Sequence, residues 1–334
     1  LSYLLRAAGD SAGESGPSWL SWLSPIGWTQ QVRPFAGERW WVFGLVAAFV
    51  AVLLAAAYVL VARRDMGAGL LPPRLGPAEA RPGLRSPIAL AWRLQRGALG
   101  GWTAGFVVFG GALGALAQGV ADLLKGNPQL ERFLEATGGA RAIVDTYLAS
   151  TLGILGLAAS AYAVQATLRL RSEETGLRAE PVLATRAGRI RWAMSHLVIA
   201  ASGTAVLLLA GGLAAGLAHG LRTGDVGGQM SRLVEATLVN LPAALVLAGI
   251  ATALFGLLPH LTAATWGALA LFLLLGQLGP MLKLSQPVMD LSPFTHVPKL
   301  PGGTLSAMPL AGLSGVALLL AGAGLAGFRH RDVG

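Results

Sequence analysis

The sequence predicts an all-α polytopic membrane protein with about seven transmembrane helices. Only 12% of its 334 residues are charged, about half the usual share in soluble globular proteins, and 54% are hydrophobic. Apolar runs of about 20 residues, long enough to cross a bilayer, alternate with short charged clusters. Such a chain has too little polar surface for a water-soluble fold and too much hydrophobicity for intrinsic disorder.

Seven apolar stretches carry this prediction. They span residues 40–62, 100–121, 143–168, 195–218, 236–257, 263–282 and 308–327. The first begins at Trp40 and runs to Val61 without a charged residue, which makes it the clearest span. Only residues 258–262 separate the fifth stretch from the sixth, and Pro259 there predicts a tight hairpin between two helices.

The distribution of charge predicts the orientation. The loops on one side of the membrane carry 15 basic and 6 acidic residues, whereas the loops on the other side carry 10 of each. The first side therefore holds the whole net charge of +9, and the positive-inside rule places it in the cytoplasm, together with the C-terminus. Because orientation explains the basic excess, no nucleic-acid partner is expected. The chain has no cysteine, which excludes disulfides and thiol chemistry.

An approximate internal repeat predicts the domain organisation. Leu23-Ser24-Pro25 and Leu291-Ser292-Pro293 each precede an apolar span that closes in a basic residue, Arg, Asp, an apolar residue and Gly. Matching elements at nearly equal spacing indicate duplication of a six-helix half. We therefore expect an extracellular loop at 1–39 belonging to a longer chain, the last helix of a first half at 40–62, a cytoplasmic linker at 63–85 and a second six-helix half at 86–334.

Three segments of the second half are candidates for function. Ser86-Pro87 can start a helix, and residues 86–97 predict either an interfacial helix in which Trp92, Arg93 and Arg96 meet the headgroups or the polar start of the next span. The cytoplasmic loop 169–194 is dense in both charges, which suits docking to a soluble partner, although a solvated loop that only enforces topology has the same composition. Residues 283–307 predict an extracellular cap containing Asp290, Ser292, Pro293 and His296.

The loop 169–194 resembles a known family. Its order of Glu-Glu, Gly, Glu, Leu-Ala-Thr, Arg and Trp, between the second and third spans of a half, resembles the coupling segment of ABC-2-type exporter permeases, most closely the two-half bacterial permeases for polyketide-type antibiotics. The resemblance implies a permease in the bacterial plasma membrane that exports a hydrophobic small molecule and docks on a separate ATP-binding subunit in two copies. The implied contacts are Glu173, Glu174, Gly176, Glu180, Leu183, Ala184, Thr185 and Arg189.

The sequence contains no G-x-x-x-x-G-K-[ST] phosphate loop, so ATP hydrolysis is expected in the partner, and no cofactor or metal is expected in this chain. A secondary transporter is the main alternative, although it would favour charged residues near the bilayer midplane. A retinal receptor would need a lysine in the last span, which has none. The sequence Gly312-Leu313-Ser314-Gly315 matches a rhomboid-like protease motif, but every histidine lies at a span end or in a loop.

Overall fold

The computed structural model describes residues 22–33, 37–62, 86–124, 139–279 and 281–331, in two compact units, Leu1–Glu79 and Ala80–Gly334. The first unit contains α2 (Pro25–Gln31) and α3 (Trp41–Ala62). Helix α3 is uniformly apolar, and 22 residues at about 1.5 Å rise suffice to cross a bilayer. The predicted linker 63–85 and most of the predicted loop 1–39 lie outside the described residues.

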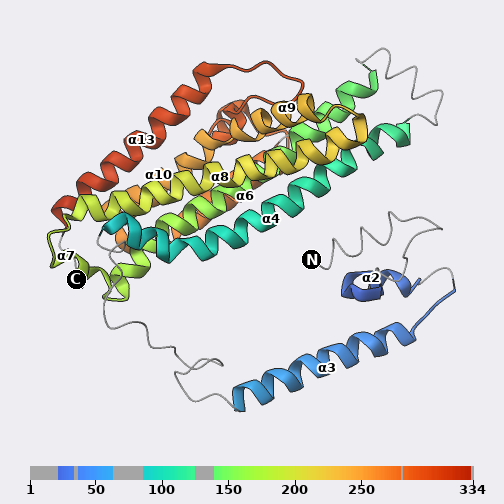
Figure 1. Ribbon diagram of the computed structural model, residues 1–334, viewed down its shortest axis with the longest axis horizontal. Coiled ribbons are helices and arrows are strands. Elements are labelled where there is room, and N and C mark those ends of the chain that lie inside the picture. Colours follow the sequence, from blue (N-terminus) through green and yellow to red (C-terminus); the bar gives the residue numbers. More distant parts are fainter. Residues whose placement is uncertain (1–21, 34–36, 63–85, 125–138, 280, 332–334) are drawn as a thin grey trace. The chain divides into compact units, whose positions relative to one another are not determined.

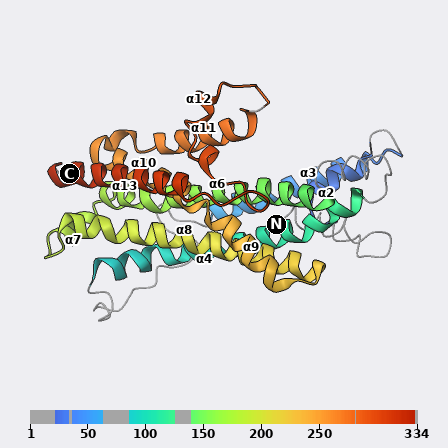
Figure 2. The same ribbon diagram turned by 90° about the horizontal axis from the view of Figure 1, so that it is seen from above.

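The second unit is a bundle of long helices (Figure 1). Its elements are α4 (Pro87–Leu124), α6 (Gly139–Thr175), α7 (Ala179–Leu183), α8 (Arg189–Thr223), α9 (Val226–Leu238), α10 (Leu241–Leu257), η4 (Pro259–Leu261), α11 (Ala264–Leu278), α12 (Gln286–Met289), η5 (Pro293–His296) and α13 (Ala307–His330). Helices α4, α6 and α8 lie side by side, α9 folds back on α8, and α13 packs along α10 (Figures 1 and 2).

The predicted fold class is confirmed. In the described part of the chain, six helical segments are long and apolar enough to cross a membrane, and α11 is a shorter apolar helix. The helices extend beyond the predicted apolar stretches because charged residues at their ends remain compatible with helix where water is available. Residues 258–262 form the turn η4, and the helix breaks between α9 and α10 at Val239 and Asn240.

Residues 86–97, predicted as a separate interfacial helix, are continuous with the span and form the first turns of α4. The predicted start is present, because the Ser86 hydroxyl accepts a hydrogen bond from the Ala89 N–H (3.3 Å) and Pro87 is the first helical residue. Helix propensity explains why the helix is continuous. No residue that breaks a helix lies between Ala89 and the apolar span, and the glycines in this segment only lower its helix propensity. Whether these turns lie at the membrane surface stays a prediction.

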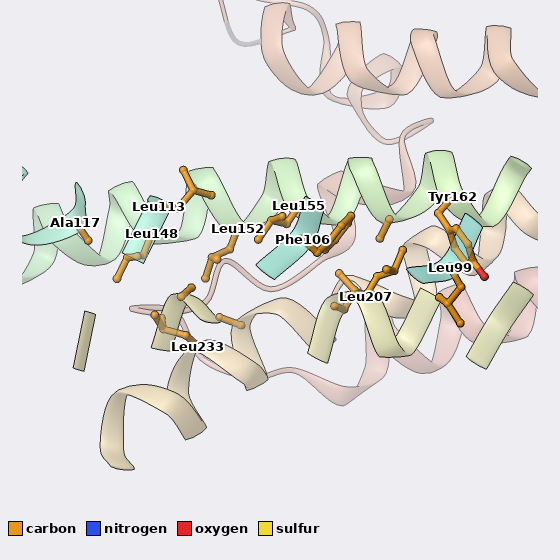
Figure 3. Close-up of a cluster of buried hydrophobic side chains, with 14 of the residues drawn as sticks. Leu99, Phe106, Leu113, Ala117, Leu148, Leu152, Leu155, Tyr162, Leu207 and Leu233 are labelled. Atoms are coloured by element: carbon orange, nitrogen blue, oxygen red, sulfur yellow. The ribbon is translucent and has the colours of Figure 1, made fainter. Parts of the chain in front are cut away.

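The bundle core lies between α4, α6, α8 and α9. Figure 3 shows its side chains running from Ala117 and Leu148 at one end to Leu99 and Tyr162 at the other. Leucines from α6 and α8, including Leu152 and Leu207, are fully buried along this line. Because lipid tails are as apolar as leucine, these side chains stabilise the bundle through close van der Waals packing.

Two helix pairs are in backbone contact through small residues. A Cβ on Gly110 or Gly114 of α4 would collide with the backbone of Gly211 or Ala215 of α8. A Cβ on Gly256 of α10 would likewise collide with the backbone of Gly324 on α13. The two glycines of α4 therefore allow close packing against α8. Such contacts let helices approach closely in a membrane, where dispersion and not the hydrophobic effect holds them together.

The two Ser-Pro elements have similar local structures. Ser24 precedes α2 and its hydroxyl accepts from the Gly27 N–H (3.3 Å); Ser292 precedes η5 and its hydroxyl accepts from the Phe294 N–H (3.4 Å). Both serines are fully buried, and each element precedes a long apolar helix. This likeness supports the duplication, which stays a prediction.

Candidate functional site

The predicted coupling loop is a short, structured turn between two long helices. Helix α6 continues to Thr175 and α8 begins at Arg189, so only residues 176–188 connect them. Glu180 and Pro181 lie in the first turn of α7, as their sequence predicts. Leu177 has a φ of 55°, a left-handed conformation that leucine rarely adopts. The turn therefore has a defined backbone path.

Two buried glutamates hold this turn. Glu173 and Glu174 are only 5% and 8% exposed. Glu173 forms ion pairs with Arg169 of the same helix (2.8 Å) and with Arg178 (2.9 Å), and the second pair joins the last turn of α6 to the connection. Arg178 also donates to the Ser172 carbonyl (2.9 Å). Buried carboxylates need such partners, because an unpaired buried charge is strongly destabilising.

The second glutamate links α6 to the end of α13. Glu174 pairs with Arg171 (2.9 Å) and with Arg331 (2.5 Å), which is 157 residues further along the chain. The Arg331 guanidinium also lies 5.2 Å from the ring centre of Phe255 and 5.6 Å from that of Phe328, within cation–π range. Arg189 donates to the Arg331 carbonyl (2.7 Å). We call Glu173, Glu174 and their four arginine partners the Glu173–Glu174 clamp.

An aromatic cluster supports the clamp. Trp192 of α8, Phe255 of α10 and Phe328 of α13 are almost fully buried, and the ring centre of Phe328 lies 5.8 Å from that of Trp192 and 5.0 Å from that of Phe255. Ala179 of α7 is buried in the same cluster, and Leu183 packs against it. The apolar side of α7 is thus packed against three of the long helices.

The eight residues proposed from the sequence as contacts for a partner do not form one surface. Glu173 and Glu174 are buried and have partners within the chain, and Leu183 is half-buried. The exposed members are Gly176, Glu180, Ala184, Thr185 and Arg189. We call these five, with exposed Leu177 and Arg186, the turn surface. Leu177 is 63% exposed.

Sequence reasoning missed two features of this site. Arg331 was assigned only to the basic end of the last span, and its pairing with Glu174 has no local sequence signal. Leu177 was not singled out, although an apolar residue in a charged loop is a signal that could have identified it.

The predicted cap forms small turns at the opposite end of the bundle. Asp290 accepts from the Gln286 amide (2.7 Å), and the His296 ring nitrogen Nε2 lies 3.0 Å from the Asp290 carbonyl. Ser292 and Pro293 are buried. The neighbouring Phe294 packs against residues of α10, α11 and α13. The four proposed cap residues thus lie close together.

The Asp145–Arg232 ion pair lies at the same end as the cap. Asp145 of α6 pairs with Arg232 of α9 (2.6 Å), and a Cβ on Gly302 would lie 3.1 Å from the Asp145 Cβ. The end of the cap therefore packs against this ion pair.

The residues predicted for the headgroup region are all exposed on α4. Trp92 is 48% exposed, and Arg93 and Arg96 lie on the surface of the same turns. Trp92 and Arg96 line one end of an open apolar groove that continues along α4 to Val108. Within the described residues, no group of three or more His, Asp or Glu side chains could hold a metal ion.

Comparison with known proteins gives the family. Residues 84–329 match the family described as "Multidrug efflux system permease Rv1217c, C-terminal domain". The chain belongs to this family. It is also 44% identical over 332 residues to the multidrug efflux system permease protein Rv1217c of Mycobacterium tuberculosis, covering 99% of this chain and 60% of that relative. The chain thus spans 60% of the length of the efflux permease that it matches.

Proposed function

We propose that this chain is the C-terminal part of the transmembrane permease of an ATP-driven exporter that expels lipophilic antibiotics or drugs. Membership in the efflux permease family supports a transport role, as do the six described helical segments that are long and apolar enough to cross a membrane. The ATP-driven mechanism rests on one observation: a charged turn is fixed on the bundle by the Glu173–Glu174 clamp.

The clamp favours a docking turn over a solvated loop. A loop that only enforces topology needs basic residues near the membrane, and these can remain fully hydrated. Here two carboxylates are instead desolvated, a cost that close pairing with four guanidinium groups offsets. The result is a fixed outer face with exposed Leu177, Glu180 and Arg186, which combines an apolar contact with both signs of charge.

The proposed partner is a separate ATP-binding subunit, present in two copies in the whole transporter. The turn surface is proposed to face the cytoplasm of a bacterial cell, because its side of the membrane carries the basic excess. The C-terminus then lies in the cytoplasm, and the cap 283–307 lies outside.

The structure suggests how movement would be transmitted. Closure of the ATP-binding subunits would push on the turn surface. Because Glu173 and Glu174 connect the turn to α6 and α13, and the aromatic cluster connects it to α8 and α10, the push reaches four helices together. The bundle would then change from an inward-open to an outward-open arrangement.

Charge reversal on the turn surface tests this proposal. The full-length permease, co-expressed with its ATP-binding subunit, is purified in mild detergent as wild type, as Glu180→Arg and as Glu235→Arg. Glu235 is an exposed glutamate of α9 near the opposite end of the bundle, which makes it a matched control. We expect Glu180→Arg to reduce the retained ATPase at least fivefold, because like charges across an interface are unfavourable.

Two outcomes would contradict the proposal. Equal retention of the ATPase by Glu180→Arg and Glu235→Arg would show that the turn surface is not the docking site. Drug transport by the permease alone, driven by a proton gradient, would favour the secondary transporter instead.

A further inference from the structure

An open groove of about 620 Å³ runs along one face of α4. Trp92 and Arg96 line one end, Val108 lies at the other end, and Val206 of α8 contributes to the wall. The lining residues of α4 recur every three or four positions, which places them on one face of the helix. None of them belongs to the turn surface, the Glu173–Glu174 clamp or the cap. We call this feature the α4 groove.

Small residues leave room in the α4 groove. Gly100 and Ala104 lie in its middle, and a Cβ on Gly100 would meet nothing within 4 Å. The Thr103 hydroxyl donates to the Leu99 carbonyl (2.8 Å), so it needs no partner from outside the helix. The middle of the groove is therefore an apolar surface, and the volume of the whole groove lies within the range of about 300–1,000 Å³ that is typical of ligand sites.

The length of the α4 groove is similar to the thickness of one lipid leaflet. Val108 follows Arg96 by 12 positions, which corresponds to about 18 Å along a helix. The hydrocarbon core of a bilayer is about 30 Å thick, so one leaflet contributes about 15 Å. An extended acyl chain that begins near Arg96 would therefore follow the groove to its far end.

One end of the α4 groove carries positive charge that the bundle does not neutralise. Arg96 lines this end, and Arg93 is exposed on the same turns. Among the residues that the structure describes, neither arginine forms an ion pair, whereas the arginines of the Glu173–Glu174 clamp and Arg232 all do. The helix α8 contains no acidic residue, and Asp122 of α4 lies at the opposite end of that helix. The charge at this end therefore favours an anionic group.

A second apolar helix would suit this end of the groove poorly. A helix packed over Arg96 would desolvate an unpaired guanidinium, which costs free energy. The apolar helix α3, for example, contains no charged residue that could pair with Arg96. A phospholipid with an anionic headgroup has both parts that the groove calls for, because its acyl chain is apolar and its phosphate accepts hydrogen bonds from arginine.

We propose that the α4 groove binds one anionic phospholipid, with an acyl chain along Gly100 and Ala104 and the phosphate at Arg96. Trp92 lies at the same end, and tryptophan is enriched at the level of the lipid headgroups. Arg93 adds to the positive potential that attracts anionic headgroups. Under the predicted orientation, the lipid belongs to the cytoplasmic leaflet. The site requires only that the bundle crosses a membrane, so it is independent of the ATP-driven mechanism.

Native mass spectrometry of the full-length permease in mild detergent tests the site. The probes are dioleoylphosphatidylglycerol, which is anionic, and dioleoylphosphatidylcholine, which has the same chains and no net charge. We expect the first phosphatidylglycerol to bind about tenfold more tightly than the first phosphatidylcholine. Arg96→Gln should weaken phosphatidylglycerol binding about tenfold and leave phosphatidylcholine binding within about twofold, because only a charge-assisted contact is lost.

A second variant tests the apolar part of the site. Gly100→Leu should weaken the binding of both lipids about fivefold or more, because the leucine side chain would extend into the groove. Its Tm should stay within about 2 °C of wild type, since a Cβ at this position meets no other atom within 4 Å and leucine favours helix more than glycine does.

Each variant has a matched control. Gly101→Leu makes the same change at the next position, which is also exposed and open but does not line the groove. Arg329→Gln removes one positive charge from an exposed position near the end of α13, a helix that does not line the groove. Both controls should leave the affinity for phosphatidylglycerol within about twofold of wild type.

Three results would overturn the proposal. Equal affinity for the two lipids in wild type would show that the groove does not select an anionic headgroup. Displacement of phosphatidylglycerol by glycerol 1-phosphate, which lacks acyl chains, would show an anion site at Arg96 that does not use the groove. A lower Tm for Gly100→Leu, together with unchanged phosphatidylglycerol binding by Arg96→Gln, would show that a helix of the remaining part of the permease covers the groove.

Discussion

Replacement of Glu174 by glutamine should destabilise the bundle far more than the same change at Glu180. The two residues lie six positions apart near the same turn, and both substitutions keep the shape of the side chain. Glu174 is 8% exposed and has two arginine partners, whereas Glu180 is exposed. The comparison therefore isolates the effect of burial and pairing.

The magnitude follows from the contacts. Glu174 accepts from Arg171 at 2.9 Å and from Arg331 at 2.5 Å. Hydrogen bonds to charged groups contribute about 1.5–3 kcal/mol each, and removing one partner of a buried pair costs about 3–5 kcal/mol. Because glutamine can still accept one bond, we expect a loss of about 3 kcal/mol for Glu174→Gln and under about 0.5 kcal/mol for Glu180→Gln.

Thermal unfolding of the detergent-solubilised full-length protein measures the difference. At about 2–4 °C per kcal/mol, Glu174→Gln should lower the Tm by about 6–12 °C, and Glu180→Gln by less than about 2 °C. A double variant with Arg331→Gln should lose less than the sum of the two single changes, because the pair is already broken. Equal Tm values for the two glutamate variants, or strict additivity with Arg331→Gln, would refute the clamp.

Three further changes test other contacts of the bundle. Gly114→Ala should destabilise the bundle by about 1–3 kcal/mol, because the added Cβ would collide with the α8 backbone. In the same Tm assay, Gly111→Ala should be neutral or slightly stabilising, because its Cβ would meet nothing within 4 Å. Asp145→Asn should speed hydrogen exchange in the cap 283–307 by removing the charge that pairs with Arg232 at 2.6 Å; unchanged exchange there would contradict a role in holding the cap. Phe328→Ala should cost about 3–5 kcal/mol, as for other buried aromatic side chains, and a Tm loss below about 3 °C would contradict its place in the aromatic cluster.

The membrane-crossing helices could be predicted from sequence because their signal is local and repeated. Each apolar stretch is recognisable by itself, and a bilayer imposes a minimum length of about 20 residues. The helix ends were less predictable. Because Arg169 and Arg171 are charged, the sequence predicts a loop there. Both residues instead lie within α6, where their side chains pair with Glu173 and Glu174 of the same helix.

The sequence indicates this turn as a candidate site, which stays a prediction, but the burial and pairing of its residues could not be derived from the sequence. Glu173 and Glu174 look like solvated residues of a charged loop, and only tertiary structure shows that both are buried. The partner of Glu174 on α13 lies 157 residues away, and no pattern within the loop indicates it. Glu180, Thr185 and Arg189, by contrast, are exposed as a docking role requires.

The glycine contacts limit which movements the bundle can make at low energetic cost. Helices α4 and α8 interlock at Gly110 and Gly114, and α10 and α13 interlock at Gly256 and Gly324, so sliding within either pair would force backbones into collision. Each pair is therefore expected to move as one body, and α6, which contacts α4, α8 and α10, lies between the pairs beside the direct contacts of α8 with α10 and α13. The proposed alternating access would then need few independent movements. The α4–α8 pair and the α10–α13 pair would rock relative to each other about α6, whose end carries the buried glutamates.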